Sequence, residues 1–274
     1  MQYYLRKTTI LSGLLFLILL CFCEFCVADN NVACSQLRLA FYEDGALFYR
    51  NAKGEFLGID KDVVDELQRR TACSFRTSVD SRVRIWAQIR QGTLDLSVSG
   101  IATKEREKFT RFIPYFSTHN FAILRKNLPP ESQSAEGFLA YSQLRVGVVK
   151  GFQHGETYEA WLAQMRSQGR VEEVGDFETV IRLFRAHRID AMLALPTGML
   201  PLQAPELREQ FVIKDWVPTE TVNFSLVISK ANVSDELAVL FEKTIADMRK
   251  DGCIEAILHK HLGPDLMTNV HNVN

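Results

Sequence analysis

The chain has 274 residues, of which 32 are Lys or Arg and 33 are Asp or Glu, so its formal net charge is −1. This balance argues against a protein that binds nucleic acid through its overall charge, because such proteins carry a clear excess of basic residues. Apolar residues make up 47% of the sequence, which is typical of a globular protein with a hydrophobic core.

Residues 1–28 have the layout of a secretory signal peptide. A basic pair precedes the apolar stretch Ile10–Cys23, and the small residues of Cys26–Ala28 supply a cleavage point. An uncleaved anchor helix is the less favoured alternative, because the apolar stretch is short for a membrane span. Lipid attachment at Cys21 is disfavoured because the bulky Leu20 precedes it. We therefore expect an exported protein.

Removal of that segment leaves three cysteines, Cys34, Cys73 and Cys253. In an exported protein two of them are expected to form a disulfide. Cys34 and Cys73 each lie just before a predicted strand, and parallel neighbouring strands begin side by side, so we expect these two to pair. Cys253 lies on an apolar helix and is expected to be buried and free. No His and Cys residues have the spacing of a metal site, so we predict neither a metal nor a cofactor.

Short β-like runs alternate with helical patterns, which predicts α/β units built on mainly parallel sheets. The first part of the chain has the order strand, helix, strand, helix, strand, at Leu37–Phe41, Asp60–Arg70, Phe75–Val79, Ile85–Arg90 and Leu94–Val98. The same order restarts after a polar, proline-containing stretch, at Leu144–Val149, Tyr158–Met165, Val171–Val174, Val180–Ala186 and Asp190–Leu195.

This repetition predicts two similar lobes with a cleft between them. The extended segments Tyr115–Leu124 and Val222–Ser229 are expected to cross between the lobes. Two helical patterns follow, one over residues 237–248 and one over residues 254–259. Two lobes joined by strand hinges are suited to capturing a ligand by domain closure.

The segment Gly92–Phe116 indicates where a ligand binds. Its short apolar strand ends in Ser99 and Gly100, and a polar turn that carries Arg106 follows. A guanidinium group offers a rigid fork of donors, and Ser99 with nearby backbone N–H groups can complete a cradle for a small anion. The alternative is a buried strand followed by a solvated, charged helix.

Several motifs occur in a fixed order along the chain. Gly54–Asp62 reads as G-x-x-x-G-[FI]-D-x-D, and Ile89–Asp95 is similar to L-x-x-G-x-x-D. Thr103–Arg106 and Phe112–Phe116 read as T-x-x-R followed by F-x-x-P-Y-[YF]. Three later segments also match, namely Val146–Gly151, Arg188–Ala191 and Arg249–Gly252. In these motifs the chain resembles the bacterial extracellular solute-binding proteins of family 3, the periplasmic, polar-amino-acid type that supplies ABC transporters.

The resemblance implies a two-lobed periplasmic-binding-protein fold of type II, in which two hinge strands join mainly parallel sheets that are flanked by helices. Residues 29–116 and 223–274 are expected to form lobe 1, and residues 117–222 lobe 2. The resemblance also implies that the lobes close on a small carboxylate-bearing solute, either an amino acid or a related organic acid. The protein would then deliver this solute to an inner-membrane ABC permease, and we expect it to be a monomer.

The resemblance further assigns roles to residues of the cleft. Arg106 is implied to bind the ligand's carboxylate, and the turn at residues 151–155 to offer backbone N–H groups to the same carboxylate. Aromatic residues after the first strand are implied to pack on the ligand. The expected ligand-binding residues are Tyr42, Phe48, Arg82, Ser99, Gly100, Ile101, Arg106, Phe152, Gln153 and His154.

Three positions depart from the family's pattern. Ile101 stands where a Ser or Thr is usual, so that hydroxyl contact is missing or comes from Ser99. Leu195 stands where an aspartate usually binds the ligand's α-ammonium group, and losing that charge-assisted bond costs about 1.5–3 kcal/mol. Arg82 falls at or near the place of a packing aromatic residue. Together these departures favour a ligand that is richer in carboxylate than in ammonium.

Alternatives remain at several of these positions. Arg82 and Arg84 are also compatible with an ordinary charged surface. Glu43 and Asp44 could accept an ammonium group from the other lobe, which keeps amino acids among the candidate ligands. Two tryptophans fall on helix faces and are expected in the core, Trp86 and Trp161.

An enzyme is the competing function. The cyclohexadienyl dehydratases, a minority of the proteins that resemble this family, use the same cleft to eliminate water from a carboxylated ring. This chemistry requires a general acid or base, for which the candidates are Glu43, His154 and Glu156. We expect a binding protein rather than an enzyme or a detached sensor module.

Overall fold

The computed structural model describes residues 34, 36–199, 202, 204–271 and 273, which belong to the compact unit Cys34–Asn274. The predicted signal peptide, residues 1–28, lies outside the described residues. Among the residues that are described, no helix has both the length and the apolar character needed to cross a membrane.

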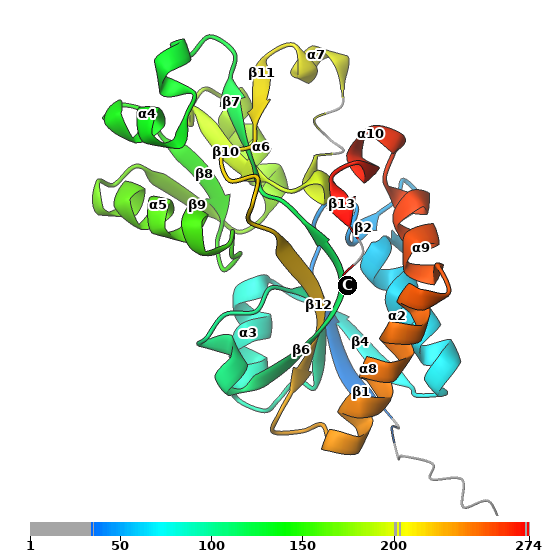
Figure 1. Ribbon diagram of the computed structural model, residues 1–274. Helices are drawn as coiled ribbons and strands as arrows, with labels where there is room; N and C mark the ends of the chain where they lie inside the picture. The colour runs from blue at the N-terminus through cyan, green and yellow to red at the C-terminus, as the bar shows by residue number, and fades with distance from the viewer. Residues whose placement is uncertain (1–33, 35, 200–201, 203, 272, 274) are drawn as a thin grey trace, which may run out of the picture. The chain divides into compact units, whose positions relative to one another are not determined.

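A six-stranded sheet combines strands from the first part of the chain with two strands from its C-terminal part. Its strand order is β13-β6-β12-β5-β1-β4, with bounds Val270–His271, Thr110–Thr118, Val222–Ser229, Leu96–Gly100, Leu37–Phe41 and Phe75–Val79. Strand β1 is parallel to β4 and β5, whereas β12 is antiparallel to β5 and β6. Figure 1 shows α3 (Arg82–Arg90) on one side of this sheet. On the other side lie α2 (Ile59–Thr71), α8 (Asp235–Lys250) and α9 (Cys253–His261).

A five-stranded sheet holds the middle of the chain. Its strand order is β11-β7-β10-β8-β9, with bounds Phe211–Lys214, Phe121–Arg125, Ala191–Ala194, Val146–Val149 and Val171–Val174. Three helices accompany it, α4 (Ala135–Ala140), α5 (Glu156–Ser167) and α6 (Phe177–Arg185). The core against this sheet includes Phe138, Tyr158 and Trp161, which confirms the prediction of a core position for Trp161.

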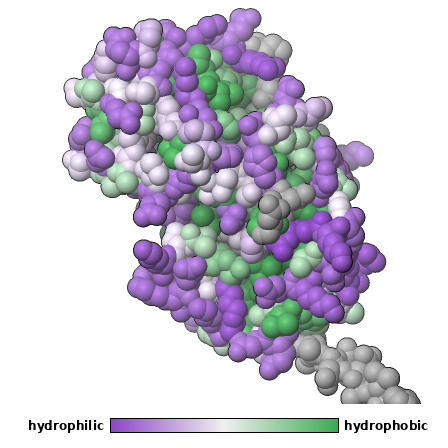
Figure 2. Space-filling model, viewed as in Figure 1, coloured by the Kyte–Doolittle hydropathy of each residue, from purple (hydrophilic) through white to green (hydrophobic). Residues whose placement is uncertain are grey.

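Short elements complete the described structure. Strands β2 (Tyr49–Arg50) and β3 (Phe56–Leu57) form a small hairpin after β1. The 3₁₀ turns are η1 (Arg106–Lys108), η2 (Pro130–Ser132) and η3 (Pro196–Gly198), and the short helices are α7 (Pro205–Arg208) and α10 (Pro264–Met267). On the face shown in Figure 2, hydrophilic side chains cover most of the surface, with smaller apolar patches between them.

The chain passes between the two sheets at two short connections. Residues 119–120 join β6 to β7, within the extended segment that was predicted to cross. The second predicted crossing, Val222–Ser229, is wrong, because β12 pairs with β6 from Val222 opposite Thr118 to Ser229 opposite Thr110. The connection is instead residues 215–221, between β11 and β12. Hydrogen bonding along its whole length places β12 in the six-stranded sheet.

The predicted disulfide is present. Cys34 and Cys73 are bonded, and their Cα atoms lie 5.0 Å apart. The physical reason is the one inferred from the sequence, because β1 and β4 are parallel neighbours with Leu37 opposite Phe75. Cys253 is free, as expected, but it is half-buried at the first residue of α9 rather than fully buried.

We expect Cys34→Ser to destabilise the protein. The disulfide closes a separation of 39 residues, and loss of such a cross-link costs about 4 kcal/mol on the chain-entropy argument. Denaturant unfolding of the oxidised protein measures this loss. The matched control is Cys253→Ser, which removes an unpaired thiol and should change stability by less than about 1 kcal/mol. Equal losses in the two variants would contradict a stabilising disulfide.

Candidate functional site

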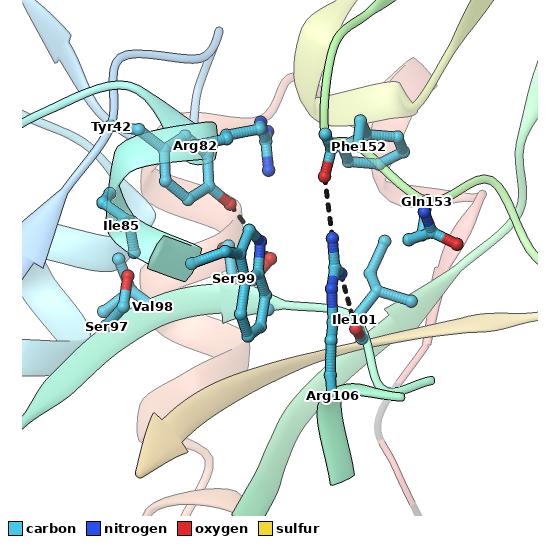
Figure 3. Close-up of a pocket in the computed structure, with 13 residues that line it drawn as sticks. Tyr42, Arg82, Ile85, Ser97, Val98, Ser99, Ile101, Arg106, Phe152 and Gln153 are labelled. Carbon is cyan, nitrogen blue, oxygen red and sulfur yellow. Dashed lines mark hydrogen bonds between the residues drawn. The ribbon is translucent and has the colours of Figure 1, made fainter. Parts of the chain in front are cut away.

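Arg106 connects the two sheets. It is the first residue of η1, which follows β5 and its turn. Its Nη1 donates a hydrogen bond of 2.8 Å to the carbonyl oxygen of Ile101 on its own side of the cleft. Its Nη2 donates one of 2.7 Å to the carbonyl oxygen of Gly151, in the turn after β8 (Figure 3). One guanidinium group therefore holds backbone from both sheets.

A small cavity lies beside the Arg106 side chain. Its volume is about 10 Å³, and it is lined by all the predicted ligand-binding residues except Phe48 and His154. Such a volume has room for about one water molecule. Residues of the first lobe's strands and of the second lobe's turn thus meet at one point, as Figure 3 shows for Tyr42, Ser99, Arg106 and Phe152.

The charge of Arg106 is strongly desolvated. Burial, followed by the positive charge of Arg82, lowers the pKa of the Arg106 guanidinium to about 10. The group is still protonated at neutral pH, so it remains a cation with two of its donors satisfied only by neutral carbonyl groups. A buried cation of this kind favours an anionic partner.

The Trp86 ring packs against the Arg106 guanidinium. The Arg106 guanidinium carbon lies 3.9 Å from the centre of the Trp86 ring, and the ring lines the cavity. The prediction that Trp86 lies in the core is wrong, since it is only half-buried. Its spacing could have indicated a position at the site, because Trp86 follows Arg82 by one helical turn and lies on the same face of α3.

Arg82 is a buried part of the site. Its side chain is 8% exposed and forms an ion pair with Asp44. Its guanidinium carbon lies 3.6 Å from the ring centre of Tyr42 and 4.7 Å from that of Phe152. The alternative of an ordinary surface charge is therefore wrong for Arg82. It is correct for Arg84, which is 77% exposed.

Ser99 is held by hydrogen bonds that leave its hydroxyl hydrogen unavailable to a ligand. The hydroxyl donates to Oδ1 of Asp60 at 2.7 Å, and the Ser99 N–H donates to the Tyr115 hydroxyl oxygen at 2.7 Å. The Ser99 carbonyl accepts from the Tyr42 hydroxyl at 2.9 Å. These contacts hold Ser99 at φ 47°, a conformation that residues other than glycine seldom adopt. Ser99 therefore shapes the cavity wall, and its hydroxyl does not replace the one missing at Ile101.

Asp60, which the sequence interpretation did not assign to the site, lies beneath that wall. Its side chain is fully buried, and Oδ1 also accepts a hydrogen bond of 2.6 Å from the Tyr115 hydroxyl. Oδ2 has no hydrogen-bond partner among the described residues. Burial raises the pKa of Asp60 to about 7, outweighing the hydrogen bonds from Tyr115 and Ser99 that lower it. Asp60 stands beside Lys61 and Asp62 in the first turn of α2, so nothing in the sequence marked it as the buried one.

Phe48 and His154 lie outside the Arg106 cavity. Phe48 stacks between Phe41 and Phe56, at ring-centre distances of 4.4 and 4.7 Å, and lines a wider cleft of about 880 Å³. His154 lies in a second small cavity, with its Nδ1 3.2 Å from Glu159. Burial lowers the pKa of His154. Direct ligand contact for these two residues stays a prediction.

Leu195 lies in the same small cavity as His154. Its side chain is 5% exposed, and much of the surrounding lining is apolar, including Phe177 and Leu193. Asp44 is the only carboxylate among the described residues that line this cavity, and it is already paired with Arg82. Among the described residues, no group of three or more His, Cys, Asp or Glu side chains could hold a metal ion.

Two mixed sheets joined by short connections, with a half-buried arginine at their junction, define the class of the fold, which is the two-lobed type II periplasmic-binding fold. The sequence pattern of the bacterial extracellular solute-binding proteins, family 3, matches residues 37–264. The chain belongs to that family, whose members are periplasmic or extracellular.

Named relatives agree with this assignment. An arginine-binding periplasmic protein from Mannheimia haemolytica is 26% identical over 164 residues, which cover 57% of this chain and 60% of that protein. The chain therefore spans less than two thirds of this relative's length. An ancestral arginine-binding protein bound to arginine superposes with a TM-score of 0.71 at 19% identity, covering 84% of this chain and 99% of that one. An ancestral amino-acid-binding protein described as a precursor of cyclohexadienyl dehydratase gives 0.68 at 18%, with coverage of 84% and 95%.

We expect Asp60 to make stability depend on pH. Its pKa is higher in the folded protein, about 7, than the ordinary value of 3.8, so the folded state binds the proton more tightly. The stabilisation is complete below about pH 4 and is lost as the pH rises through about 7. The free energy of unfolding should therefore fall between about pH 4 and pH 8, by on the order of 3 kcal/mol.

Asp60→Asn tests this assignment, because a neutral amide cannot ionise. Its unfolding free energy should lack that fall, as measured by denaturant unfolding at a series of pH values. Asp65→Asn is the matched control, since Asp65 is 55% exposed on the same helix and should keep the wild-type pH profile. The same profile in Asp60→Asn as in the wild type would show that Asp60 does not titrate in this range.

Proposed function

We propose that this protein is a periplasmic solute-binding protein that captures a small carboxylate-bearing solute and delivers it to an ABC permease. The observation that carries the proposal is the position of Arg106, a buried cation whose two hydrogen bonds run to backbone carbonyl groups on opposite sides of the cleft. A carboxylate would replace neutral acceptors by charged ones, and such bonds are about twice as strong as neutral ones.

Entry of a solute requires the two sides of the cleft to separate. A cavity of about 10 Å³ beside Arg106 is too small for any organic acid. Residues 119–120 and 215–221 are the connections that would bend, and the lobes would be residues 29–116 with 223–274 and residues 117–222. In this account the Arg106–Gly151 hydrogen bond breaks on opening, and a ligand carboxylate bridges the same two sides on closing.

The class of solute follows from the charges near Arg106. Basic amino acids are the first candidates, since two of the relatives are named as arginine-binding. In this chain, however, Leu195 stands where the second lobe would supply an acid to the ligand's ammonium group. Asp44 cannot replace that acid, because it is already paired with Arg82. Arg82 also adds a second positive charge next to Arg106. We therefore infer an organic acid, such as a 2-oxo acid, in preference to an α-amino acid.

The dehydratase alternative lacks support at the site. Glu43 is exposed and pairs with Arg50, and Glu156 is exposed at the start of α5. His154 lies in the neighbouring cavity against Glu159. Among the described residues, no Asp, Glu, His or Lys lines the Arg106 cavity, so elimination of water there would have no general acid or base of the usual kind. The protein is therefore proposed to bind its solute unchanged, as an exported monomer.

We expect Arg106→Ala to abolish most of the ligand's stabilising effect. A thermal-shift screen of the mature protein against 2-oxo acids, dicarboxylates, aromatic acids and amino acids identifies the best ligand. Loss of the charged contact should weaken that ligand about 10- to 150-fold, which corresponds to about 1.5–3 kcal/mol. Arg90→Ala, an exposed arginine on α3, is the control. An unchanged dissociation constant in Arg106→Ala would overturn the anchoring role.

We expect Leu195→Asp to shift the preference toward amino acids. The new carboxylate would face the cavity that Leu195 now lines and could pair with an α-ammonium group. Calorimetric titration with a matched pair, an α-amino acid and the 2-oxo acid of the same side chain, measures the ratio of the two affinities. The ratio should rise about tenfold or more in the variant. Leu195→Asn, which adds polarity without charge, should change it less, and equal ratios in all proteins would contradict the inference.

A further inference from the structure

We propose that Arg82 permanently occupies a cation subsite inside the cleft and thereby excludes guanidinium-bearing solutes. The subsite consists of the rings of Tyr42 and Phe152 and the carboxylate of Asp44. The inference uses the proposed function only to locate the ligand cleft. It makes Arg82 the residue that determines which charge the cleft accepts.

The contacts of Arg82 are those of a bound cation. Its guanidinium carbon lies 3.6 Å from the Tyr42 ring centre and 4.7 Å from the Phe152 ring centre, so one positive charge contacts two aromatic rings. Both distances are within the range of an attractive cation–π interaction. The third contact is the ion pair with Asp44. A guanidinium ion from solution would find the same set of partners if Arg82 were absent.

The subsite bridges the two sides of the cleft. Tyr42 directly follows β1, whereas Phe152 follows β8 in the other sheet. Figure 3 shows the Arg82 side chain passing over Tyr42 toward Phe152, on the opposite side of the cavity from the Arg106 stem. Arg82 and Tyr42 line both the small Arg106 cavity and the wide cleft of about 880 Å³. The arginine therefore stands at the boundary between the wide cleft and the anion-binding group.

This position has a consequence for selectivity. A basic solute that enters the cleft meets a positive charge where it would need a negative one, and the aromatic faces are already covered. Asp44 has an exposed fraction of only 14%, so its carboxylate is not free to pair with a second cation. An anionic solute instead approaches two arginines, Arg82 and Arg106, whose charges are close enough to lower the pKa of Arg106.

Removing Arg82 should convert the subsite into a receptor for an external cation. Arg82→Ala leaves two aromatic faces without their cation and Asp44 without its partner. A buried, unpaired carboxylate is costly, and binding of a small cation relieves that cost. The probe is ethylguanidinium chloride, which reproduces the end of the missing side chain and has no carboxylate.

The experiment is a thermal-shift titration of wild type, Arg82→Ala and Arg84→Ala. We expect roughly 20 mM ethylguanidinium chloride to raise the Tm of Arg82→Ala by about 3 °C or more, relative to sodium chloride at the same ionic strength. Wild type and the exposed-site control Arg84→Ala should show no such rise. If Arg82→Ala does not fold alone, the proposal requires ethylguanidinium, and not sodium chloride, to restore folding, as followed by circular dichroism.

Two double variants test whether the stabilisation by ethylguanidinium comes from the proposed subsite. Arg82→Ala combined with Asp44→Asn should lose the stabilisation by ethylguanidinium, because the charged partner is gone. Arg82→Ala combined with Arg106→Ala should keep it, so a failure of the proposed carboxylate-binding function is distinguished from a failure of the cation subsite. Stabilisation of wild type equal to that of Arg82→Ala, or no effect on Arg82→Ala at all, would overturn the inference.

Discussion

Burial of the Arg106 guanidinium between two sheets is the constraint on which the site depends. The group keeps its charge but has lost most of its water, and neutral carbonyl oxygens of Ile101 and Gly151 compensate for this only in part. Because one of these carbonyls belongs to each side of the cleft, the charge is best satisfied when both sides approach it. In the proposed function, closure and anion binding are two results of the same electrostatic requirement.

The wall opposite Arg106 depends on a second buried polar group. Asp60 fixes Ser99 and Tyr115 through one carboxylate oxygen, and so ties the start of α2 to β5 and β6. The left-handed backbone at Ser99 is maintained by this network rather than by a glycine. A polar network therefore gives the cavity its shape, and an aliphatic core alone would not hold that conformation.

Most of the fold and the position of Arg106 could be predicted because they follow from local patterns. Strands β1, β4, β9 and β12 have the bounds that were expected from their short runs of strand-forming residues. The partners of Arg82 could not be predicted, because Asp44 lies 38 residues away in the sequence and Phe152 lies in the other sheet. The role of Trp86 was missed for the same reason, since its contact with Arg106 joins α3 to the turn after β5, and the helical pattern alone does not show which element faces the ring. The second connection was misplaced because an extended segment and a hydrogen-bonded strand share their residue preferences.

The disulfide lies at the opposite end of two strands from the residues that contact the cleft. Cys34 and Cys73 precede β1 and β4, whereas Tyr42 and Arg82 follow the same two strands. One end of this strand pair is fixed covalently, and the other carries side chains that line the cleft. Substitution at positions 42 and 82 therefore leaves the covalent cross-link at the other end of the strand pair in place. Such a separation allows one scaffold to diverge toward new solutes while its framework stays unchanged.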